Sequence, residues 1–277
     1  MKKSKKQLPL YILAYSILFL GAAFILLPFV WMILTSLKPA NEVLLMPPKW
    51  WPSRLIFENY VEALRAAPFA RYFLNSLIVS LLVTSLELIT SILAAFAFSH
   101  YDFRLKRILF ILILATMMVP GEILLIPNFV TLARLGWIDT YQALILPWSV
   151  NVFSIFLLRQ QFIDVPLHYY KAARIDGCSD FSFLFKILVP ICRPVVVSIA
   201  LLKVISSWNA YLWPLLVTNS PTMRTLPVGL AFFSTESGVR YNILMAFSLL
   251  ISLPSLIVYF CTQKQIIQGV SKSGLKG

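Results

Sequence analysis

Polar side chains recur at intervals of three and four residues along an otherwise apolar stretch around residue 206. At 100° per residue of an α-helix, Lys203, Ser206, Asn209, Ala210 and Trp213 fall within about 60° of one direction and form one stripe. Their ammonium, hydroxyl, amide and indole groups can all hydrogen-bond to a hydroxylated solute. Polar groups inside a membrane are costly and usually functional, so this stripe predicts the wall of a translocation path.

Packing is an alternative explanation for part of this stretch. Small residues let membrane helices approach closely, and that role suits Ser206, Ser207 and Ala210 as well as solute binding does. Trp208 and Tyr211 lie outside the stripe, and we expect packing roles for both.

Lys203 needs a partner, because an ammonium group within an apolar span must meet a carboxylate, a carbonyl oxygen or water. Glu87, in another long apolar stretch, is one candidate. Glu122 lies between Met118-Met-Val-Pro120 and Pro127, where prolines can kink the chain and open it. The residues that we expect along the path are Lys203, Ser206, Asn209, Trp213, Glu87 and Glu122.

A second chemical pattern lies in the polar stretch 159–194. Pro166 can begin a helix and Gly177 can end it, because proline tolerates the first turn and glycine the left-handed position after the last. Such a helix would have about three turns. Ala172 and Ala173 would give it a small surface that another protein can approach closely. The polar groups around that surface are Lys171, Arg174 and Asp176.

The second half of this stretch is also amphipathic. Pro190 and Pro194 end it before the next apolar span. Amphipathicity is typical of any helix at a membrane surface, so alone it does not establish a docking role. The large residues that share one helical face, which we expect to lie against the span ends, are Phe181, Leu184, Phe185 and Leu188.

Residues for catalysis are missing from the sequence. A phosphate-binding loop requires the pattern G-x-x-x-x-G-K-[ST], and the chain has none, so we expect any energy from ATP to come from a partner. We find no nucleophile and base at a productive spacing and no cluster of metal ligands. His100 and His168 stand alone near predicted membrane boundaries. We therefore predict neither an enzyme nor a metal site.

Lipid must be the main solvent of the elements that carry these residues. The 277-residue chain is 59% hydrophobic and 13% charged, with a mean hydropathy of +0.82. A span needs about 20 apolar residues, and continuous rather than alternating apolar runs indicate helices. We predict an all-α membrane protein with six spans. They run approximately over 10–37, 73–98, 108–130, 141–158, 195–217 and 243–261.

The net charge of +13 follows membrane topology rather than nucleic-acid binding. Lysines and arginines concentrate in segments that share the side of the N-terminus, whereas eight lie in the opposite segments and Lys203 within a span. This bias predicts that both termini are cytoplasmic. No base-reading motif accompanies the charge. The fifteen residues on the cytoplasmic side are Lys2, Lys3, Lys5, Lys6, Arg104, Lys106, Arg107, Arg159, Lys171, Arg174, Lys186, Arg193, Lys264, Lys272 and Lys276.

The remaining segments complete one predicted membrane domain over residues 1–277. The apolar run from Leu10 is longer than a secretory signal and has no clear cleavage site, so we expect it to stay as the first span. A cytoplasmic basic tail (1–9), an external loop (38–72) with a short helix over 58–67, and a cytoplasmic tail (264–277) flank the spans. Reduced thiols are expected at Cys178, Cys192 and Cys261.

The string Ala172-Ala173-Arg174-Ile175-Asp176-Gly177, followed by Ile187, Leu188 and Pro190, resembles the EAA loop of binding-protein-dependent ABC importer permeases. Four other strings resemble the same family, specifically its MalG-type sugar permeases, so the resemblance covers almost the entire chain. The sequence departs from the family pattern at Lys171, where the family has glutamate, and at Cys178. The four strings are Asn75-Ser76-Leu77, Leu135-Gly136-Trp137-Ile138-Asp139-Thr140, Trp208-Asn209-Ala210-Tyr211-Leu212-Trp213-Pro214 and Gly274-Leu275-Lys276-Gly277.

The resemblance implies a permease of the bacterial inner membrane that imports a carbohydrate or a polyol phosphate. Its partners would be an ATP-binding-cassette ATPase dimer that holds ATP and Mg²⁺, a second homologous permease subunit and an extracellular or periplasmic solute-binding protein. This chain itself would bind no cofactor. Carbohydrate and glycerol 3-phosphate both fit, and Lys203 mildly favours an anion. The residues that would dock the ATPase are Tyr169, Tyr170, Lys171, Ala172, Ala173, Arg174, Ile175, Asp176 and Gly177.

Two other functions stay open. A secondary transporter or channel would work without an ATPase and would usually show an inverted repeat with discontinuous helices, which the sequence does not display. A scaffold for a membrane complex would need no polar stripe. Uptake by vesicles that contain this chain alone would separate these functions.

Overall fold

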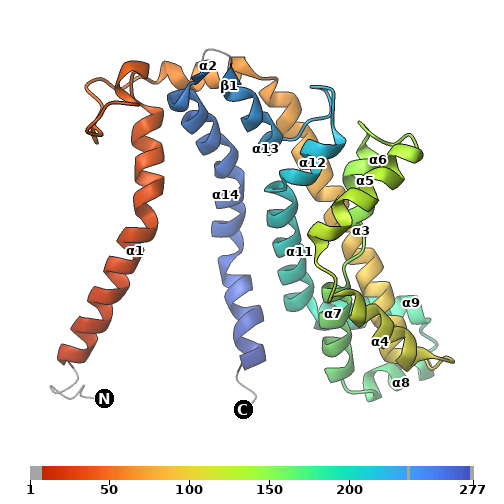
Figure 1. The fold of residues 1–277 in the computed structure, drawn as a ribbon. Helices are drawn as coiled ribbons and strands as arrows, with labels where there is room; N and C mark the ends of the chain where they lie inside the picture. Colours follow the sequence, from red (N-terminus) through yellow and green to blue (C-terminus); the bar gives the residue numbers. More distant parts are fainter. Residues whose placement is uncertain (1–7, 236–237, 275–277) are drawn as a thin grey trace. The chain divides into compact units, whose positions relative to one another are not determined.

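The computed structural model describes residues 8–235 and 238–274. Residues 1–7 and 275–277 of the predicted tails lie outside this range, as does most of the terminal string 274–277, so the cytoplasmic position of both termini stays a prediction. The chain folds as two compact units (Figure 1). One comprises residues 1–68 and 230–253, and the other comprises residues 69–229 and 254–277.

The first unit contains α1 (Leu8–Ser36), the 3-10 helices η2 (Ala40–Glu42) and η6 (Leu230–Phe233), α2 (Glu58–Ala66) and the hairpin of β1 (Ser234–Thr235) with β2 (Gly238–Val239). It also holds the start of α14 (Tyr241–Gly274). Asn59 of α2 joins these parts. Its amide donates to the backbone oxygens of Ser36 and Lys38 over 2.8 and 3.0 Å, and its oxygen accepts from Asn242 over 2.9 Å.

Apolar side chains are exposed all round α1. From Tyr11 to Val30 every described side chain of this helix is exposed, Phe24 by 79%. A helix that is apolar on all sides suits a lipid environment or the surface of another membrane protein. The first predicted span therefore exists as one continuous helix.

The second unit is organised around α3 (Phe69–His100), which packs against α7 (Val152–Asp164) and α11 (Arg193–Trp208) (Figure 1). Two apolar clusters lie along α3. One surrounds Val79 and Val83 and includes buried residues of α5 (Leu125–Arg134), α6 (Tyr141–Ile145) and α12 (Leu212–Val217). The other surrounds Ile92 and Phe96 and includes residues of α7, α8 (His168–Ile175) and α9 (Asp180–Phe183).

Three helices are long and apolar enough to cross a membrane unbroken, over Tyr11–Ser36, Phe69–His100 and Tyr241–Phe260. Three further candidates in the described part of the chain are bent pairs. The bends are 88° between α4 (Lys106–Thr116) and 121–134, 44° between 141–148 and α7, and 83° between 180–191 and α11. The all-α membrane fold is thus confirmed, and the count of six spans holds if each pair crosses once.

Short helical segments make up these bends. The 3-10 helices η3 (Gly121–Leu124) and η4 (Leu146–Trp148) precede α5 and α7. The π-helix η5 (Leu184–Leu188) and the short α10 (Val189–Ile191) precede α11, and α13 (Leu226–Gly229) follows α12.

The predicted apolar face of 181–188 is wrong in two of its four members. Leu184 and Leu188 are buried, but Phe181 is 67% and Phe185 47% exposed, while Phe183 is fully buried instead. Phe181 and Phe183 both lie in α9, which turns Phe183 toward the core, whereas the wider turn of the π-helix η5 begins only at Leu184 and affects Phe185.

Two of the family-like strings fix the connections of the second unit. Asp139, with a left-handed φ of 64°, accepts hydrogen bonds from the backbone nitrogens of Asn219 and Ser220 over 2.9 and 3.0 Å. Asn75 donates to the backbone oxygens of Thr222 and Arg224 over 2.9 and 2.8 Å. Both strings therefore hold the segment between α12 and α13 in place.

We expect Asn75→Ala to destabilise the second unit by about 1–3 kcal/mol, because its amide is buried and three hydrogen bonds would be lost. Tyr141→Phe removes only the bond from the Tyr141 hydroxyl to the Asn75 oxygen, so it should cost less. Thermal unfolding in detergent measures both effects. Equal melting temperatures for the wild type and Asn75→Ala would contradict this role.

Candidate functional site

A cavity of about 370 Å³ lies within the second unit, between α3, η3, α11 and α12. Of the six residues predicted along the path, Lys203, Ser206, Trp213 and Glu122 line it, whereas Asn209 and Glu87 do not. The other residues that line it are Ser76, Val79, Val83, Gly121, Leu125, Leu144, Trp148, Ser207, Ala210, Tyr211, Leu212, Pro214 and Thr225.

Lys203 and Glu87 form an ion pair at one side of this cavity. The Lys203 Nζ lies 2.6 Å from Glu87 Oε2, and the side chains are only 14% and 2% exposed. Ser154 of α7 donates to the other oxygen of Glu87 over 2.7 Å. The partner that the sequence suggested for Lys203 is thus the one in the structure, and the pair joins α3, α7 and α11.

Asn209 has a different position from the rest of the predicted stripe. Its side chain is exposed and donates to the backbone oxygen of Ile205 over 2.9 Å, at the end of α11. The Asn209 nitrogen still bonds to the oxygen of Ile205, so helical spacing extends to Asn209, but Ala210 and Trp213 line the cavity and Asn209 does not. By contrast, Tyr211, which we expected to pack, lines the cavity.

A buried polar stripe on α3 escaped the sequence analysis. Ser80, Thr84 and Ser91 are at most 6% exposed, and their hydroxyls have no hydrogen-bond partner among the described residues. Together with Ser76 and Glu87 they recur at intervals of three or four residues, which places all five on one face of the helix. A helical projection of the second span, like the one applied to the fifth, would have found it.

Helix α8 divides the predicted docking residues between two faces. Tyr170, Ala173 and Arg174 face the rest of the second unit. Ala173 is only 6% exposed, and the centre of the Tyr170 ring lies 5.0 Å from the centre of the Phe183 ring. Lys171 and Ile175 lie on the opposite face, where Ile175 is 87% exposed. The exposed members of the predicted set are Tyr169, Lys171, Ala172, Arg174, Ile175, Asp176 and Gly177.

Gly177 ends this helix in the way the sequence predicted. Its φ is +77°, the Gly177 nitrogen donates to the oxygen of Arg174, and the Cys178 nitrogen donates to the oxygen of Ala173 over 2.9 Å. This pair of bonds is the Schellman arrangement, which needs a left-handed residue. A side chain at this position would strain the helix end.

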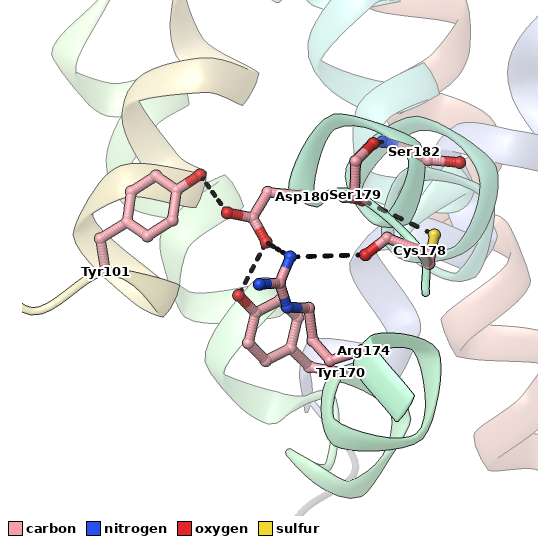
Figure 2. A network of polar contacts seen from close by, with 7 residues as sticks. All are labelled: Tyr101, Tyr170, Arg174, Cys178, Ser179, Asp180 and Ser182. Carbon is pink, nitrogen blue, oxygen red and sulfur yellow. Dashed lines mark hydrogen bonds and ion pairs between the residues drawn. The ribbon is translucent and has the colours of Figure 1, made fainter. Parts of the chain in front are cut away.

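The inner face of α8 is held by Asp180 at the start of α9 (Figure 2). Tyr170 donates to Asp180 Oδ1 over 2.8 Å and Tyr101, next to the end of α3, donates to Oδ2 over 2.9 Å. Arg174 pairs with the same carboxylate over 3.3 Å. Burial, together with the bond to Asp180, raises the pKa of both phenols, so both hydroxyls stay protonated donors at neutral pH. The network therefore joins α8, α9 and the end of α3.

Metal-ligating side chains do not gather in the described part of the chain, where no group of three His, Cys, Asp or Glu could hold an ion. His100 stacks on Phe96 with 4.9 Å between ring centres, and His168 lies beside Tyr169. Cys192 is buried and Cys178 half-buried, both with free thiols. The absence of a metal or catalytic site stays a prediction.

Comparison with known proteins covers nearly the whole chain. Residues 87–272 match the family model described as the inner membrane component of binding-protein-dependent transport systems. The arabinooligosaccharides transport system permease protein AraQ of Bacillus subtilis is 33% identical over the full length of both chains. The sn-glycerol-3-phosphate transport system permease protein UgpE of Agrobacterium fabrum is 30% identical over 94% of this chain and 95% of its own.

A solved structure has a closely similar fold. It is the crystal structure of a bacterial ABC transporter involved in the import of the acidic polysaccharide alginate, and one of its chains matches with a TM-score of 0.85. The match covers 95% of this chain and 99% of that chain at 24% sequence identity.

We expect Lys203→Met to destabilise the second unit by about 3–5 kcal/mol, because Glu87 would be left as a buried, unpaired charge. The double variant Lys203→Met, Glu87→Gln should recover much of this loss. Thermal unfolding in detergent measures the difference, with Lys186→Met, an exposed lysine of η5, as the control. A single variant no less stable than the double variant would show that the pair does not stabilise the unit.

Asp180→Asn should loosen α8, because the amide keeps one accepting oxygen instead of two, so one of the two tyrosine hydroxyls loses its acceptor, and the ion pair to Arg174 is lost as well. Backbone amide exchange over 168–175 should become faster by about tenfold, which corresponds to about 1.4 kcal/mol. Asp176→Asn, at an exposed position on the same loop, is the matched control. Identical exchange in both variants would rule out the anchoring role.

Proposed function

The chain belongs to the family of inner membrane components of binding-protein-dependent transport systems, and we propose that it is the permease subunit of an ATP-driven importer. The observation that carries this proposal is the combination of an exposed docking helix, α8, with a polar cavity in the same unit. A transporter that is driven by a separate ATPase subunit needs a surface that contacts this subunit and a translocation path whose conformation can change.

The outer face of α8 supports the docking role. Ile175, the last residue of α8, is 87% exposed. Its exposed neighbours Lys171 and Ala172 leave room for close approach and supply one positive charge. An apolar side chain with a polar rim is the usual composition of a protein interface. We infer that the occupant is the ATPase subunit, which binds ATP and Mg²⁺, while this chain binds no cofactor and is not an enzyme.

The rest of the assembly follows from the same family membership. It comprises an ATPase dimer, a second homologous permease in the inner membrane and a solute-binding protein on the outer side. Both termini and α8 would be cytoplasmic, in agreement with the excess of lysine and arginine on that side. The apolar and exposed helix α1 would lie against lipid or the second permease.

The solute class that we propose is a carbohydrate or a related polyol phosphate. Relatives are named for arabinooligosaccharides, for lactose and for sn-glycerol-3-phosphate, which share several hydroxyl groups but differ in charge. The hydroxyls of Ser206 and Tyr211 and the carboxylate of Glu122 suit hydroxyl-rich solutes. Together with Lys203 and Trp213 they would line the path, and Glu87 would hold Lys203 in place.

Movement would pass from α8 through its inner face. Closure of two ATPase subunits would shift α8, and the Asp180 network would transmit the shift to α9 and to the end of α3. Helix α3 also carries the cavity residues Ser76, Val79 and Val83, so a change in its packing would reshape the path. A secondary transporter or channel would instead show uptake by this chain alone.

We expect Ile175→Asp to reduce ATP-dependent uptake by about 10- to 100-fold, because an interface that buries isoleucine gains about 1.5–3 kcal/mol from it. ATP hydrolysis should lose its response to the loaded binding protein. Both are measured in proteoliposomes that contain the complete complex. Lys171→Glu should act in the same direction.

Lys186→Glu is the control for that experiment, because Lys186 is exposed on η5, outside α8. It should leave uptake and stimulated hydrolysis unchanged. Normal coupling in both Ile175→Asp and Lys171→Glu would refute docking through this face.

A further inference from the structure

The cavity of the second unit carries an unbalanced negative charge. Only two charged side chains line it, Lys203 and Glu122, within the described residues. The charge of Lys203 is already balanced by Glu87, 2.6 Å away. Glu122 is exposed on η3, and its carboxylate neither forms an ion pair with any described residue nor accepts a hydrogen bond from one. An approaching solute therefore meets one neutral pair and one carboxylate.

The rest of the polar lining is uncharged and consists of hydroxyl groups. Thr225 is 4% exposed, and its Oγ1 is buried without a hydrogen-bond partner in the described chain. Because this oxygen is buried, it does not contact a solute in the cavity. Ser206, Ser207 and Tyr211 add three more hydroxyls.

Aromatic rings supply the apolar part of the lining. Trp148 and Trp213 meet edge to face with 5.9 Å between ring centres, and the Trp213 nitrogen donates to the oxygen of Ala143 over 2.9 Å. This bond fixes the indole, which is 5% exposed, in the wall of the cavity. A volume of about 370 Å³ falls in the range of small-molecule sites, about 300–1,000 Å³.

We propose that this cavity binds an uncharged, hydroxyl-rich solute and that Glu122 makes it discriminate against anions. The inference rests on the proposed function and narrows its solute class, since it selects neutral carbohydrate over a polyol phosphate. It also reverses the preference that Lys203 alone suggested. The carboxylate of Glu122 accepts hydrogen bonds from sugar hydroxyls but repels a carboxylate or phosphate on the solute.

The test compares two disaccharides of the same size that differ in charge, α-1,4-galactobiose and α-1,4-digalacturonic acid. Each is titrated by calorimetry into the assembled complex in nanodiscs, without the binding protein, so that the binding protein's own selectivity does not contribute. We expect galactobiose to bind at least about tenfold more tightly than digalacturonic acid. Glu122→Gln should remove most of this difference, and Glu122→Lys should invert it.

Two variants serve as controls. Glu58→Gln removes an exposed carboxylate of α2 outside the cavity and should leave the ratio unchanged. Ser206→Ala should weaken galactobiose binding while the ratio between the two sugars stays the same, because it removes an exposed hydroxyl of the cavity and no charge. Thermal unfolding of each variant shows whether the complex is still folded.

The outcomes separate the two levels of the proposal. Equal binding of the two sugars, tighter binding of digalacturonic acid, no binding of either, or a ratio that Glu122→Gln does not change would overturn the selectivity of the cavity. The importer function would still stand if the same preparation, with its binding protein, hydrolyses ATP in response to solute. A complex with no such response would overturn the proposed function itself.

Discussion

The ion pair between Lys203 and Glu87 is the polar contact on which the packing of the three main helices of the second unit depends. Glu87 is buried, the Lys203 side chain is 14% exposed, and Ser154 donates to the second oxygen of Glu87, so α3, α11 and α7 meet at one polar point. The apolar clusters lie along α3 on either side of it. Separating α3 from α11 would expose two unpaired charges to an apolar environment. Rearrangements of the unit are therefore limited to those in which the helices turn about this contact.

Helix α3 connects the two functional regions because each uses a different part of it. The cavity takes Ser76, Val79 and Val83, whereas the Asp180 network holds Tyr101 directly after the last turn. Contiguity alone does not establish energetic coupling. Helix α3 is shared by both regions, and its ion pair from Glu87 to Lys203 lies between them. A displacement at one end of α3 therefore passes along a continuous helix and not through loops.

Much of this organisation follows from local physics that a sequence displays. Continuous apolar runs predicted the helices, Gly177 predicted the left-handed helix end, and the need of Lys203 for a counter-ion pointed to Glu87. The errors arose where regular periodicity fails. The π-helix at 184–188 interrupts the period of the predicted apolar face, and tertiary packing decides that Phe183 rather than Phe181 is buried and that Asn209 does not line the cavity. Thr225 could not be placed at the cavity, because only tertiary packing brings its loop against α3 and α11.

The short length of α8 determines how it can respond to a load. Eight residues extend for only about 12 Å, too little for the gradual curvature seen in long helices. The Schellman bonds at its C-terminal end and the hydrogen bond from Tyr170 to Asp180 leave few backbone torsions that can change. It should therefore move as a rigid body, so that a small rotation imposed at Ile175 reaches Tyr170 with the same size and direction.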